Sequence, residues 1–362
     1  MKTYKAALVG YGGMGRWHVQ GIHKTDRVVF KGTYDLNPER MYDINPARMD
    51  AAREDGITTA YPSFEALLAD PAVDIVVVAT PNNFHMPQVC QALEAGKAVV
   101  CEKPVAMSSG ELQTMMDTAR RTGSLFTVHQ NRRADADYTA VLETVNAGLL
   151  GNVFEIVSSV TGSRGIPEGW RQYAVAGGGM MLDWGVHLLD QVVMMYAPHK
   201  VTSVFCKMYH VNYQECDDGF KAFLQFDNGV MVTIEVGTSH YASVPRWYVC
   251  GDRGALLIDD WSCQGRIIRA AEHEITWEED IVYTKAGPTK TMAPRARDTI
   301  EQIELDADKY QSDYDIFYRN LADVLDGTAE LRVKPEETMR VMKLMEATFE
   351  SDRLGEVIHC DI

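Results

Sequence analysis

The chain has 362 residues, of which 46% are hydrophobic and 24% charged, a composition typical of a soluble globular protein. Because a single hydrophobic core rarely serves a chain of this length, we expect two domains. A formal net charge of -16 argues against nucleic acid as a partner and against anchoring on an anionic membrane, because both need a basic patch. No apolar stretch approaches the roughly 18 residues that span a bilayer, and the seven cysteines are scattered without a CxxC pair, which favours reduced thiols in a cytoplasmic protein.

Short apolar runs alternate with helical patterns over residues 1–126, which we expect to form the first domain. The predicted strands cover residues 6–9, 28–34, 75–79, 98–101 and 125–128. The predicted helices cover residues 15–24, 63–68, 87–95 and 109–122. The run at 75–79 is typical of a strand that is buried on both faces of a parallel sheet. The alternation predicts an α/β domain with a doubly wound parallel sheet.

Residues 127–362 have a different pattern and predict a second α/β domain with a large, mostly antiparallel open sheet. The predicted strands cover residues 152–160, 202–209, 219–226, 231–238, 247–249 and 255–258. The predicted helices cover residues 138–147, 180–196 and 335–350, and the last of these could pack back on the first domain. Between two of the strands, Asp227-Asn228-Gly229 predicts a hairpin turn.

A glycine-rich turn follows the first predicted strand and opens the first predicted helix, which is the context that gives a GxGxxG pattern its meaning. Gly10 permits the tight turn, Gly12 lets the backbone approach a pyrophosphate, and Gly15 lets the helix pack close to the strand. Gly13 and Met14 lie at the helix N-terminus, where free N–H groups and a partial positive charge favour phosphates. The pattern predicts a Rossmann domain that binds a dinucleotide.

Asp35 lies 20 residues past Gly15, at the end of the second predicted strand. A carboxylate there accepts hydrogen bonds from the adenine-ribose hydroxyls and repels a 2′-phosphate, so we expect NAD as the cofactor rather than NADP. Arg40 could soften this preference. A glycine-rich turn without a ligand is the alternative, and the strand, the spacing and the acid together disfavour it.

Further segments resemble the Gfo/Idh/MocA family of oxidoreductases. They are residues 79–85 (ATPNNFH), 102–104 (EKP), 131–133 (NRR), 177–190 (GGGMMLDWGVHLLD) and 250–254 (CGDRG). The EKP segment together with the GGGxxxDxGxH pattern is specific. The resemblance implies a Rossmann domain followed by an α/β domain whose open sheet commonly forms oligomers, and substrates that are sugars, cyclitols or their derivatives.

Three residues are candidates for catalysis. Lys103 follows a predicted strand, at the sheet edge where ligands bind, and its ammonium can stabilise a developing alkoxide. Asp183 and His187 are four residues apart and share one face of a predicted helix. A histidine with a pKa near working pH is the usual general base for an alcohol, and the aspartate can orient it or bind the substrate. A structural His–Asp pair is the alternative, and the resemblance favours catalysis.

Metal binding by Asp183, His187 and Asp190 is a further alternative. No second histidine lies at metal-ligand spacing, and a hydride acceptor already supplies the electrophile, so we expect no metal.

The resemblance extends the expected contacts to other residues. For the cofactor these are Thr80, Pro81, Asn83, His85, Glu102, Lys103 and Asn131. For the substrate they are Arg132, Arg164, Trp170, Arg171, Asp183 and His187. Family members often carry an aromatic residue where this chain has Ala134, which suggests a roomier pocket. The Trp170 ring can stack on a sugar, and a loop residue packed on its own domain is an equal alternative.

The reaction we expect is hydride transfer between NAD and a secondary ring hydroxyl of a sugar, cyclitol or glycoside, including C3 of a glucoside to give a 3-keto product. One alternative is glycoside cleavage by transient oxidation, with the NAD held in place. Another is a non-catalytic dinucleotide sensor, which the presence of Lys103 and His187 disfavours. We expect a homo-oligomer formed through the second sheet, with no nucleic-acid or membrane partner.

Overall fold

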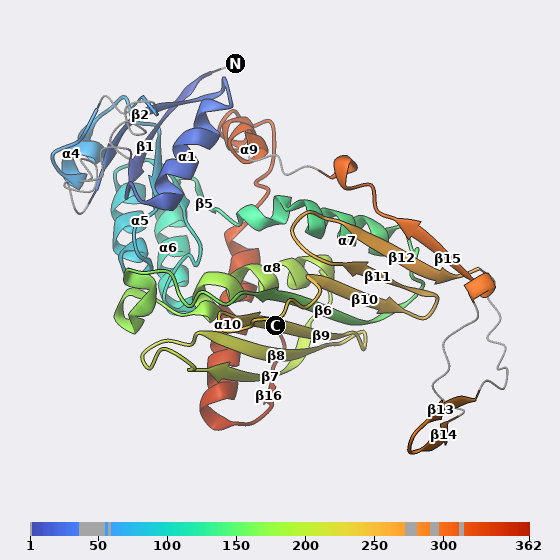
Figure 1. The fold of residues 1–362 in the computed structure, drawn as a ribbon. Coiled ribbons are helices and arrows are strands. Elements are labelled where there is room, and N and C mark those ends of the chain that lie inside the picture. The colour runs from blue at the N-terminus through green and yellow to red at the C-terminus, as the bar shows by residue number, and fades with distance from the viewer. Residues whose placement is uncertain (1, 36–54, 57–58, 272–280, 290–296, 311–314) are drawn as a thin grey trace.

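The computed structural model describes the chain except residues 1, 36–54, 57–58, 272–280, 290–296 and 311–314 (Figure 1). Its first sheet has five parallel strands in the order β2-β1-β3-β4-β5. The strands are β1 (Tyr4–Val9), β2 (Val28–Tyr34), β3 (Ile75–Val78), β4 (Ala98–Cys101) and β5 (Phe126–Val128). The predicted doubly wound parallel sheet is confirmed.

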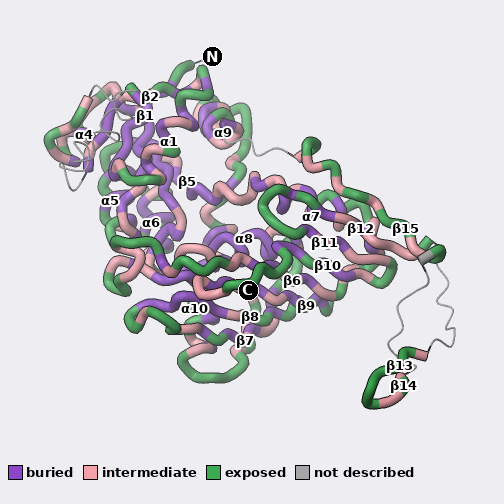
Figure 2. The backbone as a smooth tube through the Cα atoms, in the orientation of Figure 1, coloured by how far each residue is buried: buried purple, intermediate pink, exposed green. Residues whose placement is uncertain are grey.

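Helices cover both faces of this sheet. They are α1 (Gly13–His23), α4 (Phe64–Ala69), α5 (His85–Glu94) and α6 (Ser109–Thr122). In β3, Ile75 and Val77 belong to the apolar cluster under α1, whereas Val76 and Val78 belong to the cluster under α5 and α6. All four side chains are fully buried, which explains why this run is apolar without interruption. Buried residues also predominate in the labelled strand β5 of the same sheet (Figure 2).

The second sheet has nine strands in the order β15-β12-β11-β10-β6-β9-β8-β7-β16. They are β6 (Val153–Thr161), β7 (Val201–Tyr209), β8 (Gly219–Phe226), β9 (Met231–Gly237), β10 (Trp247–Gly251), β11 (Gly254–Ile258), β12 (Gly265–Ala270), β15 (Ile300–Glu304) and β16 (Ile358–His359). Among the described strand pairs of this second sheet, only β6–β9 is parallel, so the predicted mostly antiparallel sheet is confirmed. The predicted hairpin turn joins β8 to β9, with Gly229 at φ +88°. A small separate hairpin, β13 (Val282–Thr284) with β14 (Gly287–Thr289), extends from the body (Figure 1).

One face of the large sheet is covered by α7 (Ala136–Asn146), α8 (Val186–Met195) and α10 (Pro335–Leu354). None of the described helices is long and apolar enough to span a membrane. All seven cysteines are free thiols.

The helix predicted at 180–196 differs from the observed one at its start. Residues Met181–Gly185 form a π-helical turn, in which the Val186 N–H reaches back to the Met181 carbonyl, and α8 follows. Asp217 caps this turn, since its Oδ2 accepts a hydrogen bond of 2.8 Å from the Met181 N–H. A Cβ at Gly185 would lie 2.6 Å from Met181 Sδ and 3.0 Å from the Phe220 ring, so a larger residue there would require these side chains to shift. The π turn lies in the segment that carries Asp183, and such turns are frequent at functional sites.

The C-terminal part of the chain returns to the first sheet. Helix α9 (Asp315–Leu325), which the sequence analysis did not predict, packs on α1 and β2. Helix α10 contacts α6 and β5, as expected for a terminal helix that packs back on the first domain. Strand β5 is also bonded to this C-terminal segment, since Thr127 Oγ1 donates a hydrogen bond of 2.8 Å to the Val333 carbonyl.

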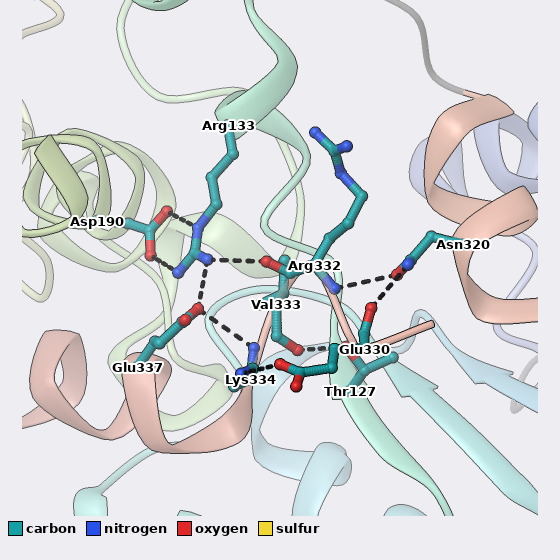
Figure 3. Close-up of polar contacts among 9 residues, drawn as sticks. All are labelled: Thr127, Arg133, Asp190, Asn320, Glu330, Arg332, Val333, Lys334 and Glu337. Atoms are coloured by element: carbon teal, nitrogen blue, oxygen red, sulfur yellow. Dashed lines mark hydrogen bonds and ion pairs between the residues drawn. The ribbon is translucent and has the colours of Figure 1, made fainter. Parts of the chain in front are cut away.

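Arg133 ties the second half of the chain together beside β5 (Figure 3). Its guanidinium donates two hydrogen bonds, of 2.7 and 2.8 Å, to the carboxylate of Asp190 on α8. It also donates to Glu337 Oε2 at 2.6 Å, in the first turn of α10. The Asp190 carboxylate is therefore engaged by the Arg133 guanidinium.

Candidate active site

The glycine turn between β1 and α1 has the geometry of a phosphate cradle. Gly10 has φ +93°, and a Cβ there would lie 2.6 Å from the Ala79 carbonyl oxygen. A Cβ at Gly15 would lie 2.2 Å from the Gly10 carbonyl oxygen, so α1 packs against the turn without side chains between them. Gly12 and Gly13 have open space above them. The backbone at the α1 N-terminus can therefore approach a pyrophosphate directly.

Asp35 stands directly after β2, and its Oδ2 accepts a hydrogen bond of 2.8 Å from the Tyr11 N–H. This bond places the carboxylate beside the glycine turn, where the sequence analysis expects the adenine ribose. Arg40 lies outside the described residues.

A hollow extends from the glycine turn to the end of β4. Its lining consists of Gly12, Gly13, Met14, Ala79, Thr80, Asn82, Glu102, Lys103, Trp170 and Arg171. Six of the residues predicted to bind the cofactor are thus brought together. Asn82, which the sequence analysis did not single out, is 2% exposed and donates from Nδ2 to the Gly177 carbonyl at 2.7 Å, joining the first sheet to the glycine run before the π turn.

Other predicted cofactor contacts lie away from this hollow. His85 is fully buried, and its ring nitrogens lie at hydrogen-bond distance from the carbonyls of Thr80 (2.9 Å) and Pro104 (3.0 Å). His85 therefore supports the backbone of the EKP turn. Pro81 and Asn83 do not line the hollow either. Asn131 lines a separate cavity of about 140 Å³ together with Ala134.

Lys103 and Asp183 join the two halves of the chain at the centre of the site. Lys103 Nζ donates to the Asp183 carbonyl at 2.9 Å and to Asp183 Oδ1 at 3.1 Å. Arg171 Nε lies 3.2 Å from Asp183 Oδ2. Although burial alone would raise the pKa of Asp183, the charges of Lys103 and Arg171 hold it below its ordinary value. Asp183 is therefore an ionised bridge between two cations.

His187 lies one turn further along, and its side chain is buried. Its Nδ1 has no hydrogen-bond partner among the described residues, and its ring makes an edge contact with Trp184 at 5.9 Å between centroids. Burial, together with the charges of Lys103 and Arg132, holds the pKa of His187 well below its ordinary value. The imidazole is thus neutral at pH 7, whereas the sequence analysis assumed a pKa near working pH.

Glu102 heads a buried network that the sequence analysis did not predict. Its Oε1 lies 2.7 Å from both His18 Nε2 and His129 Nδ1, and the Tyr318 hydroxyl lies 2.5 Å from His18 Nδ1. Burial alone would raise the pKa of Glu102, but His129 and His18 hold it well below its ordinary value. The side-chain oxygen of Glu102 and the ring nitrogens of His18 and His129 are close enough together to bind a metal ion. In the structure these atoms are hydrogen-bonded to one another instead. The network fixes the backbone that carries Lys103.

A larger cleft of about 620 Å³ includes Trp184 of the π turn in its lining. It is lined by Arg132, Val160, Thr161, Gly162, Ser163, Arg164, Gly165, Pro167, Met180, Trp184, Val236, Gly237, Thr238 and Trp261. Arg132 and Arg164 were predicted to contact the substrate and line this cleft. Trp170 and Arg171 line the cofactor hollow instead. The loop at 162–172 therefore borders both spaces.

Two tryptophans that the sequence analysis missed form a wall of the cleft. The Arg132 guanidinium lies 4.2 Å from the Trp184 ring centroid and 5.2 Å from that of Trp261. Trp184 stands within the GGGxxxDxGxH segment, so that motif could have indicated it. Trp261 lies outside every motif, and no sequence signal points to it.

Two family models match this chain. Residues 4–130 match the oxidoreductase family with an NAD-binding Rossmann fold, and residues 138–257 match the GFO/IDH/MocA C-terminal domain.

Individual proteins are similar over much or all of the chain. A solved structure of an NAD-binding protein from Listeria innocua is 40% identical, covers 99% of this chain and 100% of its own, and has a TM-score of 0.90. The scyllo-inositol 2-dehydrogenase (NADP(+)) IolW of Bacillus subtilis is 26% identical over 80% of this chain and 79% of that protein. The D-glucoside 3-dehydrogenase of Escherichia coli is 28% identical over 57% of this chain and 65% of that protein.

Proposed function

Because the chain belongs to the Gfo/Idh/MocA family of NAD-binding oxidoreductases, we propose that it oxidises a secondary ring hydroxyl of a sugar, cyclitol or glycoside. The observation that carries this proposal is the contact of Lys103 with Asp183, with His187 one turn away. We place the reacting hydroxyl beside the Lys103 ammonium, which lines the cofactor hollow, and beside the neutral imidazole of His187, which is not among the residues that line either space.

The residues of the glycine turn fit a dinucleotide. Gly12, Gly13 and Met14 would hold the pyrophosphate, and Asp35 would accept hydrogen bonds from the adenine ribose. When bound, NAD supplies the hydride acceptor. Residues 1–126 would then form the cofactor-binding unit and residues 127–362 the substrate-binding unit, with α9 and α10 packed back on the first.

The side chains of the site divide the proton chemistry between them. His187 accepts the proton of the substrate hydroxyl, since its depressed pKa keeps the base form available. Lys103 donates a hydrogen bond to the same oxygen and stabilises its developing negative charge. Asp183 and Arg171 fix the ammonium in place. The like charge of Lys103 disfavours an imidazolium at His187, which promotes onward transfer of the proton to water.

The cleft supports a cyclic polyol as the substrate. The Trp184 and Trp261 rings offer apolar faces for the C–H side of a sugar ring. The hydroxyls of Thr161, Ser163 and Thr238 can exchange hydrogen bonds with ring hydroxyls. Two similar proteins are named as dehydrogenases of scyllo-inositol and of D-glucosides at C3, and we propose oxidation at C3 of a glucoside as one specific reaction.

A panel of polyols and glycosides with NAD tests this function, with NADH absorbance as the readout. We expect the His187→Ala variant to lose activity by about 10²- to 10⁴-fold, because a positioned general base contributes that much. The variant should still bind NAD with the affinity of the parent, measured by fluorescence titration, since the glycine turn is untouched. Equal rates in variant and parent would remove His187 from its role as the base. Product formation without net NADH would favour glycoside cleavage by transient oxidation.

We further propose that the protein works as a homo-oligomer in a reducing compartment such as the cytoplasm. Seven free thiols suit such a compartment. The uncovered face of the large sheet carries a row of side chains in register, Phe205, Phe223, Thr233, Val157, Tyr248 and Leu257, which crosses β7, β8, β9, β6, β10 and β11. A largely apolar row of this length is typical of a protein interface.

A further inference from the structure

The substrate cleft has a charge opposite to that of the whole molecule. The protein has a formal net charge of -16, yet no aspartate or glutamate is found among the described residues that line the cleft. Two arginines, Arg132 and Arg164, do line it. A cleft with one sign of charge concentrates ligands of the other sign.

The two arginines differ in their partners. Arg132 is neutralised in part, because its Nη1 donates to Asp135 Oδ2 at 2.9 Å and its guanidinium stacks on Trp184. Arg164 has no hydrogen-bond or ion-pair partner in the described part of the chain, and its side chain is exposed to the cleft. The cation that remains available to a ligand is therefore that of Arg164.

The loop that carries Arg164 is fixed on both sides. The Gly162 N–H donates to the Gly237 carbonyl at 2.8 Å, and the Gly162 carbonyl accepts from the His240 N–H at 2.7 Å. The Gly165 N–H donates to the Thr238 carbonyl at 3.1 Å. Arg164 thus stands between two residues bonded to the end of β9, and its backbone is pre-organised before a ligand arrives.

We propose that the substrate carries an anionic group, a carboxylate or a phosphate ester, that binds the guanidinium of Arg164 while the ring lies against the indole wall. A guanidinium presents a fork of N–H donors that matches both anions. The anionic group would lie toward the 162–165 loop, and the hydroxyl to be oxidised toward Trp184, whose ring contacts that of His187. This inference rests on the proposed function, since it assigns a substrate class to the same cleft.

Matched substrate pairs test the inference. Methyl β-D-glucoside is compared with methyl β-D-glucuronide, glucose with glucose 6-phosphate, and myo-inositol with a myo-inositol monophosphate. The kcat/KM with NAD is measured for the parent, for Arg164→Gln and for Arg164→Lys. The control is Arg120→Gln, an exposed arginine on α6. The uronide and phosphate arms distinguish the two anions.

We expect the parent to prefer the anionic member of at least one pair. Arg164→Gln should lower kcat/KM for that member by about 10- to 100-fold, which corresponds to one charge-assisted interaction. The loss on the neutral member should be clearly smaller, Arg164→Lys should restore part of the loss on the anionic member, and Arg120→Gln should match the parent on both. Preference for the neutral members by the parent, or equal losses on both members in Arg164→Gln, would overturn the inference and leave the proposed function intact.

Binding without turnover gives a second measurement. Titration with glucuronate and glucose 6-phosphate, each against glucose, is followed by the fluorescence of the cleft tryptophans in the parent and in Arg164→Gln. Tighter binding of an anion that disappears in the variant supports the anion site even if the chosen carbon is not oxidised. Equal binding of anions and glucose rejects it.

Discussion

We propose that cofactor choice depends on Asp35, whose carboxylate lies beside the glycine turn through its bond with the Tyr11 N–H. We expect Asp35→Ser to weaken NAD binding by about 10- to 100-fold, the value of hydrogen bonds to a charged acceptor. The same change should improve NADP binding, because the repulsion of a 2′-phosphate is removed. Dissociation constants for both dinucleotides, from fluorescence titration, check this expectation.

The matched control is Asp26→Ser, an exposed aspartate before β2. If Asp35→Ser weakened NAD and NADP equally, Asp35 would have no part in selecting between them.

Single residues were predicted from the sequence only where a local motif fixes their surroundings. The glycines of the turn, Lys103 and Asp183 all stand in such motifs. Glu102 also stands in one, yet its carboxylate is engaged by His18 and His129, which are 84 and 27 residues away. No local pattern reveals partners at that separation.

The π turn at Met181–Gly185 concerns a whole element. Asp217 caps it, and burial is the main cause that raises the pKa of Asp217 from 3.8 to about 7. Between these values the folded protein holds a proton that the unfolded chain releases, so stability falls as the pH rises through this window. We expect Asp217→Asn to remove this dependence, because the amide oxygen still accepts the Met181 N–H but does not ionise.

Melting temperatures of parent and variant at pH 5, 6, 7 and 8 measure the effect. The difference between the two proteins should shift in favour of the variant as the pH rises. Asp260→Asn, at an exposed turn, serves as the control. A pH-independent difference between Asp217→Asn and the parent would show that Asp217 does not titrate in this range.

Elements were predictable where periodicity and burial agree, as in β3 or α6. The π turn was predicted as ordinary helix, because its cap, Asp217, lies 36 residues away from Met181 in the sequence. Helix α9 was missed although its apolar residues, Tyr318, Leu321 and Ala322, are spaced for one face. The partner of that face is α1, which lies some 300 residues earlier in the chain, so no local pattern indicates the packing.

At the scale of the whole molecule, the large sheet has one face that no helix covers, and we predict that copies of this chain associate through it. Phe223 is 44% exposed and Tyr248 39% exposed in the apolar row that crosses the sheet. We expect the double variant Phe223→Glu, Tyr248→Glu to dissociate the oligomer, because charges at the centre of an apolar interface are left without partners. Light scattering after size-exclusion chromatography measures the mass.

The control is Val29→Glu, which places the same charge at a 41% exposed apolar position of the first sheet. A parent that is monomeric at micromolar concentration, or a double variant with the parent's mass, would contradict assembly through this face.

Helix α9 also has a consequence for biosynthesis. The apolar cluster of Ala6, Leu8 and Val77 is closed by Tyr318 and Leu321, which leave the ribosome last among these residues. During most of translation, the nascent Rossmann domain therefore exposes the apolar surface that α9 will later cover. Such a surface is a target for chaperones and for aggregation until the final segment docks.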